Sequence, residues 1–139
     1  MIHKTKGFTL VELVLVIAIL GILAVAALPQ FINVSTQARQ ASRDGVSGAV
    51  RSGIMLFRAN DLVVNGAPGA WPATLDAAAA ASTAGASNLF FGTILTQGVG
   101  DGNWSKGASA NVYNYTDGTT TFVYTYNPAT GTFTSPTAP

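Results

Sequence analysis

Very few side chains in this sequence can do acid–base or nucleophilic chemistry. His3 is the only histidine, Glu12 is the only glutamate, and cysteine is absent. Beyond the N-terminal segment the chain therefore offers no imidazole and no thiol, which excludes hydrolytic triads and typical zinc sites there. The aspartates are isolated from one another along the sequence. We expect a structural protein that is not an enzyme and that needs no cofactor.

Glu12 is the most informative of these residues, because it lies in an apolar run from Phe8 to Leu28. At about 1.5 Å per helical residue, this run is long enough to cross a hydrocarbon core about 30 Å thick. A carboxylate in such a run costs about 2 to 3 kcal/mol on insertion scales, so it requires a partner or a function. We expect no partner for it within the run. A protease cut after Gly7 would create an ammonium group at Phe8, one helical turn away.

The residues on either side of the Gly7-Phe8 junction form a recognisable motif. Residues 6–13 read Lys-Gly-Phe-Thr-Leu-Val-Glu-Leu, and the apolar run that follows is succeeded by Pro29. This pattern resembles the class III leader and stalk of type IV pilins and of the related pseudopilins of type II secretion. The resemblance implies cleavage by a prepilin peptidase between Gly7 and Phe8, and N-methylation of Phe8. It also implies that Glu12 meets the Phe8 ammonium of a neighbouring subunit and that Pro29 kinks the helix.

The segment after the stalk carries a finer resemblance. Residues 30–33, Gln-Phe-Ile-Asn, and the following helix to about Gly53 are similar to pilins of the mannose-sensitive haemagglutinin type. The family resemblance implies an α+β class fold, in which a long kinked N-terminal helix packs its second half on a small antiparallel sheet. The expected segments are a cleaved leader (1–7), a transmembrane and filament-core helix (8–28), its amphipathic continuation (29–60) and a globular head with a connecting loop (61–139).

The same resemblance implies partners and a location. The partners are further copies of the chain in a helical homopolymer, prepilin peptidase, the pilus assembly platform and minor pilins. Lys4 and Lys6 flank the N-terminal end of the span, which by the positive-inside rule keeps that end cytoplasmic. We therefore expect a precursor in the bacterial inner membrane with an extracytoplasmic head, and then an extracellular surface filament.

Other interpretations of the N-terminal segment stay open. Ala24-Val25-Ala26 could be the cleavage site of an ordinary secretory signal peptide, and a plain single-pass anchor would also explain the apolar run. Glu12 and the Gly7-Phe8 junction favour the pilin interpretation over both. Within that interpretation the chain is a main subunit of a surface pilus, a pseudopilin of a secretion machine, or a minor or adhesive pilin.

After the span the apolar pattern stays helical to about Asn60. The stripe expected to face a sheet consists of Phe31, Val34, Ala38, Ala41, Gly45, Ala49, Ile54 and Phe57. Arg39, Arg43, Arg51 and Arg58 fall within one arc of this helix. We favour a solvated face, or ion pairs with neighbouring subunits, over binding of DNA or anionic surfaces, because no aromatic residues are interleaved. No specific nucleic acid is predicted.

The C-terminal part predicts a connecting segment followed by an antiparallel sheet. Thr74 can cap a short helix through the Ala77 to Ala81 tract. The expected strands are Leu89 to Leu95, Asn111 to Thr116, Thr119 to Tyr126 and Thr132 to Ser135. Asp117-Gly118 is a strong hairpin signal between the middle two. The tyrosines and Phe122 on alternate positions of these two strands are expected to join sheet and helix.

One loop begins a calcium-binding pattern. Asp101, Asn103 and Ser105 occupy alternate positions in residues 98–107. The pattern then fails, because the expected glutamate is replaced by Val112 and Lys106 adds a positive charge. We expect a glycine-rich surface loop with no metal, and these three residues are the weak candidates if an ion is held.

Overall fold

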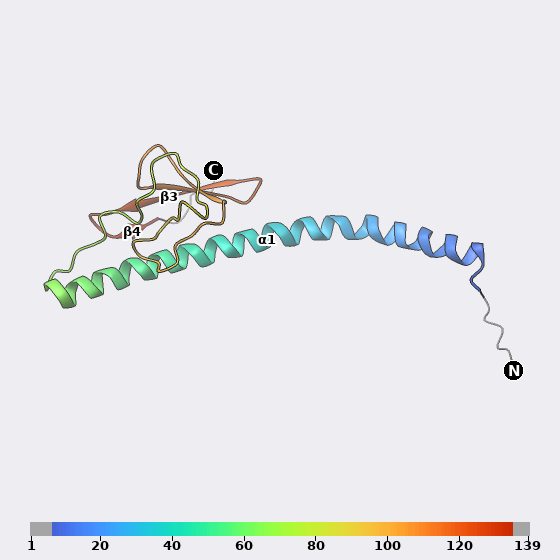
Figure 1. The fold of residues 1–139 in the computed structure, drawn as a ribbon, viewed down its shortest axis with the longest axis horizontal. Helices are drawn as coiled ribbons and strands as arrows, with labels where there is room; N and C mark the ends of the chain where they lie inside the picture. The colour runs from blue at the N-terminus through green and yellow to red at the C-terminus, as the bar shows by residue number, and fades with distance from the viewer. Residues whose placement is uncertain (1–6, 135–139) are drawn as a thin grey trace. The chain divides into compact units, whose positions relative to one another are not determined.

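The computed structural model describes residues 7–134, apart from the side chains of Ile32 and Asn33. Its elements are one helix, α1 (Leu10–Asn65), and four strands, β1 (Trp104–Lys106), β2 (Val112–Thr116), β3 (Thr121–Asn127) and β4 (Thr132–Phe133) (Figure 1). The chain divides into two compact units at Ala38 and Arg39, and α1 contributes to both. A long N-terminal helix followed by a small antiparallel sheet confirms the α+β fold expected from the sequence.

The ends of α1 differ from the predicted bounds. It begins at Leu10 instead of Phe8, because Thr9 is the N-cap residue whose carbonyl accepts from the Leu13 amide at 3.2 Å. It ends at Asn65, not near Asn60, where Gly66 takes a φ of 87° and its amide donates to the Leu62 carbonyl at 3.1 Å. A left-handed glycine of this kind is a common helix terminator, since it has no Cβ to clash.

Helix α1 continues through Pro29, as the uninterrupted pattern on both sides predicts. A proline inside a helix removes one backbone donor and crowds the preceding turn, which favours a bend. The kink at Pro29 stays a prediction.

The four strands form one sheet in the order β1-β2-β3-β4, with antiparallel neighbours. The predicted hairpin is confirmed: Thr116 pairs with Thr121 at its closed end. Asp117 organises the turn between them, because its carboxylate accepts from the amides of Thr119 at 3.0 Å and Thr120 at 2.8 Å. Strand β4 covers Thr132–Phe133, and Ser135 of the longer predicted strand lies outside the described residues.

An aromatic core lies between the sheet and the second half of α1. Tyr113 and Tyr115 of β2 and Tyr124 and Tyr126 of β3 are all buried, which confirms the predicted alternation. Phe91 forms edge-to-face contacts with Trp104 and Phe133 at 5.4 and 6.0 Å between ring centres. Val50 and Ile54 of α1 belong to the same core. Gly53 allows the turn that contains Ile94 to approach the helix, since a Cβ on Gly53 would lie 2.8 Å from the Ile94 carbonyl oxygen.

The predicted sheet-facing stripe of the helix was wrong from Phe31 to Ala49, because all six of its residues in this range are exposed. Ala41, Gly45 and Ala49 are exposed, whereas Val50 and Ile54 are buried. The step of five residues from Ala49 to Ile54 turns far from one face of a helix with 3.6 residues per turn. The buried residues Ser47, Val50 and Ile54 keep the three-to-four spacing that this period requires, and Val46 and Phe57 beside them are partly buried.

The helix predicted in the connecting segment was also wrong. The Ala77 to Ala81 tract forms no helix, because the chain after it runs beside β1: the Ala84 amide donates to the Trp104 carbonyl at 2.9 Å and the Lys106 amide to the Ser82 carbonyl at 2.8 Å. Backbone pairing with a distant strand thus overrides the helix propensity of alanine.

The segment from Leu89 to Leu95 is a turn instead of a strand. Phe91 has a φ of 60°, and the Leu95 amide donates back to the Phe91 carbonyl at 2.8 Å. Its one strand-like contact is a bridge between Phe90 and Val99. The apolar run therefore supplies two buried rings to the core instead of a strand to the sheet.

Candidate functional site

The first residues of α1 form a local arrangement around Glu12. Thr9 donates to Glu12 Oε2 twice, from its backbone amide at 2.8 Å and from its hydroxyl at 2.9 Å. The Glu12 amide returns a bond to the Thr9 hydroxyl at 3.3 Å. This is a capping box, in which the N-cap residue and the third residue beyond it satisfy each other's free groups.

The expectation that Glu12 has no partner within the apolar run was wrong in this respect. The signal was present in the sequence, because Thr-x-x-Glu before an apolar stretch is the capping-box pattern. The partners that Thr9 supplies are uncharged, however. Within residues 7–134 no hydrogen bond to Glu12 Oε1 is found.

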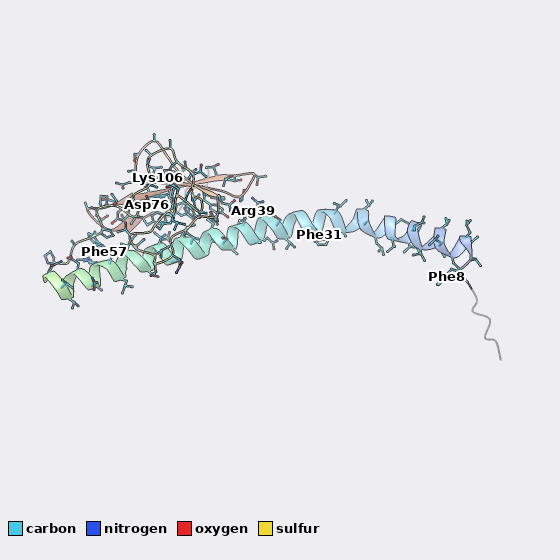
Figure 2. All side chains as sticks on the ribbon, viewed as in Figure 1. Phe8, Phe31, Arg39, Phe57, Asp76 and Lys106 are labelled. Carbon is cyan, nitrogen blue, oxygen red and sulfur yellow. The ribbon has the colours of Figure 1, made fainter. Side chains whose placement is uncertain are left out.

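The junction residues lie at the open end of this arrangement. Phe8 precedes the helix and is 89% exposed (Figure 2). Gly7 has no atom within 4 Å of the position where a Cβ would lie, so the backbone there is open to an approaching enzyme. Met1 to Lys6, with the basic residues of the predicted leader, lie outside the described residues.

The first part of α1 exposes an apolar surface along its length. Its mean hydropathy reaches 2.9, and it is the one helix among the described residues that is long and apolar enough to cross a membrane. Leucine, isoleucine and valine side chains from Leu10 to Leu28 are exposed. An apolar surface of this extent requires either lipid or another apolar surface.

The arginines of the second half of α1 contact the head. Arg43 lies over the Phe122 ring and Arg58 over the Trp71 ring, each 4.1 Å from the ring centre. Arg51 donates to the Phe133 carbonyl at 3.3 Å. These aromatic partners are distant from the arginines in sequence, so they give no interleaved pattern along the helix. These contacts place three of the four side chains on the head's own surface.

The calcium-loop candidates are engaged in local structure. The Asp101 carboxylate accepts from the Asn103 amide at 3.0 Å, and Ser105 is the central residue of β1, paired with Asn114. Among the described residues no group of three or more acidic, histidine or cysteine side chains could hold a metal.

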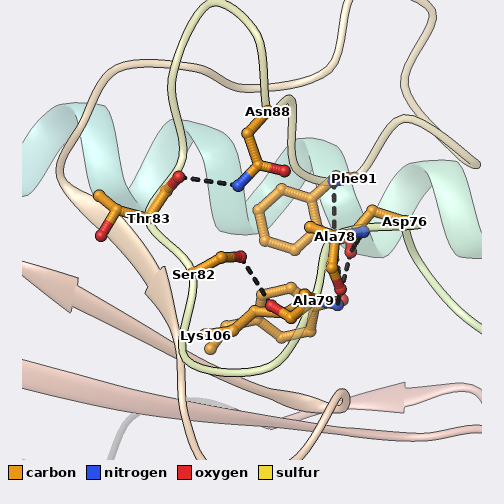
Figure 3. Close-up of polar contacts among 9 residues, drawn as sticks. Asp76, Ala78, Ala79, Ser82, Thr83, Asn88, Phe91 and Lys106 are labelled. Carbon is orange, nitrogen blue, oxygen red and sulfur yellow. Dashed lines mark hydrogen bonds and ion pairs between the residues drawn. The ribbon is translucent and has the colours of Figure 1, made fainter.

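A buried ion pair in the head was not anticipated from the sequence. Lys106 of β1 and Asp76 of the connecting segment meet at 2.5 Å, and both side chains are 1% exposed (Figure 3). Tyr113 donates to the Asp76 carboxylate at 3.0 Å. Burial, followed by the neighbouring Asp76 charge, raises the pKa of Tyr113 above its ordinary value. The sequence holds no local signal for this pair, since its members come from elements that only the fold brings together.

Comparison with known proteins identifies a known motif in the N-terminal segment. Residues 2–28 match the family described as the prokaryotic N-terminal methylation motif. The major component PilA5 of the type IV narrow pilus of Thermus thermophilus is 51% identical over 49 residues, which cover 35% of this chain and 42% of that protein. The fimbrial protein EcpC of Eikenella corrodens is 30% identical over 95 residues, 68% of this chain and 56% of that protein.

A third relative is also a fimbrial protein. The type IV major fimbrial protein FimA of Dichelobacter nodosus is 43% identical over 49 residues, 35% of this chain and 31% of that protein. This chain thus covers less than two thirds of the length of these relatives. No solved structure matches the chain.

The methylation motif and these relatives support assigning the chain to the type IV pilin family. The finer likeness to pilins of the mannose-sensitive haemagglutinin type is not confirmed and stays a prediction.

Proposed function

We propose that this chain is the structural subunit of a type IV pilus filament that supports adhesion, motility or surface contact. The observation that carries the proposal is the exposed apolar first part of α1, from Leu10 to Leu28, which lies within the methylation motif and contains a single carboxylate, Glu12. In a filament, helices of other subunits replace the lipid around this surface. The role is structural and not enzymatic, in keeping with relatives that are named as pilus and fimbrial components.

Maturation by prepilin peptidase gives the segment its second charge. Cleavage between Gly7 and Phe8 leaves an ammonium at Phe8, which is then methylated. The exposure of Phe8 and the open space around Gly7 support this assignment. The precursor resides in the bacterial inner membrane, from which the assembly platform, together with minor pilins, adds subunits to the surface filament.

Glu12 is the assembly residue in this proposal. The capping box leaves one carboxylate oxygen unbonded within the described chain, and it supplies no positive charge. The Phe8 ammonium of an adjacent subunit provides a hydrogen-bond donor for this oxygen and the missing positive charge. A charge left alone in an apolar filament core is far more costly than a matched pair, so this contact also fixes the axial position of each subunit.

Electron microscopy of material sheared from the cell surface, with identification of its main component, tests the proposal. We expect filaments of micrometre length built mainly from this chain. Filaments in which it is a trace component would indicate a minor or adhesive pilin. Its absence from sheared fibres, together with calcium-dependent melting of the head, would indicate a pseudopilin of type II secretion.

A further inference from the structure

The buried pair of Asp76 and Lys106 has more around it than an ion pair needs. Both side chains are 1% exposed, and the rings of Phe91, Tyr113 and Trp104 form part of the same core. Two opposite charges out of water gain stability only when their geometry and remaining hydrogen bonds are good. The same enclosure removes the water that would compete with a reaction between an amine and a carboxyl group.

The two carboxylate oxygens of Asp76 have different surroundings. Oδ2 accepts two hydrogen bonds, from the Phe91 amide at 3.1 Å and from the Tyr113 hydroxyl at 3.0 Å. Oδ1 faces the Lys106 ammonium at 2.5 Å and accepts from the Ala78 amide at 3.0 Å (Figure 3). Two fixed donors on one oxygen, with a nucleophile beside the other, are the arrangement that stabilises the oxyanion of acyl transfer.

We propose that Asp76 and Lys106 condense to an intramolecular amide bond in the folded head. The ammonium passes one proton to Oδ1, and the neutral Nζ attacks Cγ while Oδ2 takes the developing negative charge. Oδ1 accepts a second proton from the nitrogen and leaves as water. The Nζ–Cγ bond forms, the Cγ–Oδ1 bond breaks and one hydrogen stays on the nitrogen, so the step needs no oxidant and no further reactant.

The surrounding groups suit the product. The Lys106 nitrogen already donates to the Ala78 carbonyl at 3.0 Å, which is the one bond that an amide N–H requires. Oδ2 would become the amide carbonyl and would keep both of its donors. The amide carries no charge, so the cost of burying two charges is removed. Because the fold holds the amine and the carboxyl group in contact, the reaction is intramolecular and needs no encounter between separate molecules.

Such a bond would close the segment between residues 76 and 106, which contains β1 as its one regular element. The chain has no cysteine with which to staple this segment. The amide would do so without an oxidising environment, and it does not depend on the chain's role in a filament.

Trypsin tests the bond sharply, because Lys106 is the only lysine or arginine after Arg58. The full-length chain is purified from membranes in detergent, denatured completely, digested and analysed by mass spectrometry. The proposal predicts one peptide covering residues 59–139, lighter than its sequence by one water, with fragmentation that joins Asp76 to Lys106. This reading is independent of processing at the N-terminus.

The outcomes against the proposal are equally distinct. Separate peptides 59–106 and 107–139 in the wild-type digest would overturn it. A lost water within either separate peptide would count against it too, because Asp101-Gly102 and Asp117-Gly118 can lose water as cyclic imides. Lys106→Arg is the matched control: it keeps the charge and the trypsin site, and its peptides 59–106 and 107–139 must separate.

Discussion

Two carboxylates of this chain, Asp76 of the head and Glu12 of the apolar run, differ in the number and charge of their partners among the described residues. Asp76 in the head has a cation, a tyrosine hydroxyl and two backbone amides around it, all from the same chain. Glu12 at the beginning of α1 has the amide and hydroxyl of one threonine. Asp76 thus has its partners within the head, whereas the partners of Glu12 among the described residues are uncharged, as the proposed contact with a neighbouring subunit requires.

The apolar surfaces of the two regions differ in the same way. In the head, aromatic rings from the sheet and the connecting segment are buried against Val50 and Ile54. From Leu10 to Leu28 the side chains are exposed. The head therefore has a hydrophobic core of its own, and the first part of α1 requires lipid or neighbouring helices to cover it.

Removing the Glu12 carboxylate is expected to have the largest effect. Glu12→Ala should still insert, be cleaved and carry a folded head, but filaments should be absent or strongly reduced, because the Phe8 ammonium loses its partner. Electron microscopy of sheared material measures this. Thr9→Val is the matched control for the capping box, whose loss costs about 1 kcal/mol of local helix stability and leaves the charge in place. Normal filaments from Glu12→Ala would mean that the carboxylate does not set the register of subunits.

Removing the cation beside the Asp76 carboxylate should give the largest change in the stability of the head. Lys106→Met leaves Asp76 buried without a cation, and the free energy of unfolding should fall by about 3 to 5 kcal/mol. Thermal unfolding of the full chain in detergent, followed by near-ultraviolet circular dichroism of the buried rings, checks this. Asp44→Asn removes a surface ion pair and should change stability by less than about 1 kcal/mol. Equal melting of both variants would show that the buried pair is dispensable.

The corrected helix face can be tested by two neighbouring substitutions. Ile54→Ala removes a fully buried side chain and should destabilise the head by about 2 to 4 kcal/mol. Met55→Ala alters a side chain that is 59% exposed and should have little effect on the same unfolding curve. If Met55→Ala were the more damaging variant, α1 would be rotated relative to the sheet.

The smallest expected effect concerns the turn between β2 and β3. Hydrogen bonds from the Thr120 and Thr119 amides lower the pKa of Asp117 to about 2, from an ordinary value of 3.8. Because the pKa of Asp117 is lower in the folded state than in the unfolded state, its ionised carboxylate stabilises the head at any pH above about 4. This stabilisation is lost as pH falls from about 4 to about 2. Melting temperatures of wild type and Asp117→Asn should differ at neutral pH and converge in acid. A constant difference would argue against the turn as the cause.

The elements that could be predicted are those whose signals are local. The helix follows from its apolar period, and the β2–β3 hairpin from Asp117-Gly118 between alternating aromatics. The Ala77 to Ala81 tract was misjudged, because its backbone pairs with β1 across the fold. β1 itself was missed: three residues inside a glycine-rich loop carry no distinct pattern until Ser82 and Ala84 lie beside them.

The same distinction holds for the candidate site. Gly7, Phe8 and Glu12 could be found because the motif is contiguous in sequence. The Thr9 cap could have been found from its spacing to Glu12. Asp76 and Lys106 could not, since a contact between distant residues depends on the tertiary fold.

The most direct test of the filament account is the N-terminal mass of the chain isolated from surface fibres. Cleavage between Gly7 and Phe8 leaves Glu12 one helical turn from a new ammonium, and the proposed assembly contact depends on it. Mass spectrometry of the N-terminal peptide should show a chain that begins at Phe8 and carries one methyl group. A chain that begins near Ala27 would contradict the account, because the apolar helix and Glu12 would then be absent from the mature protein.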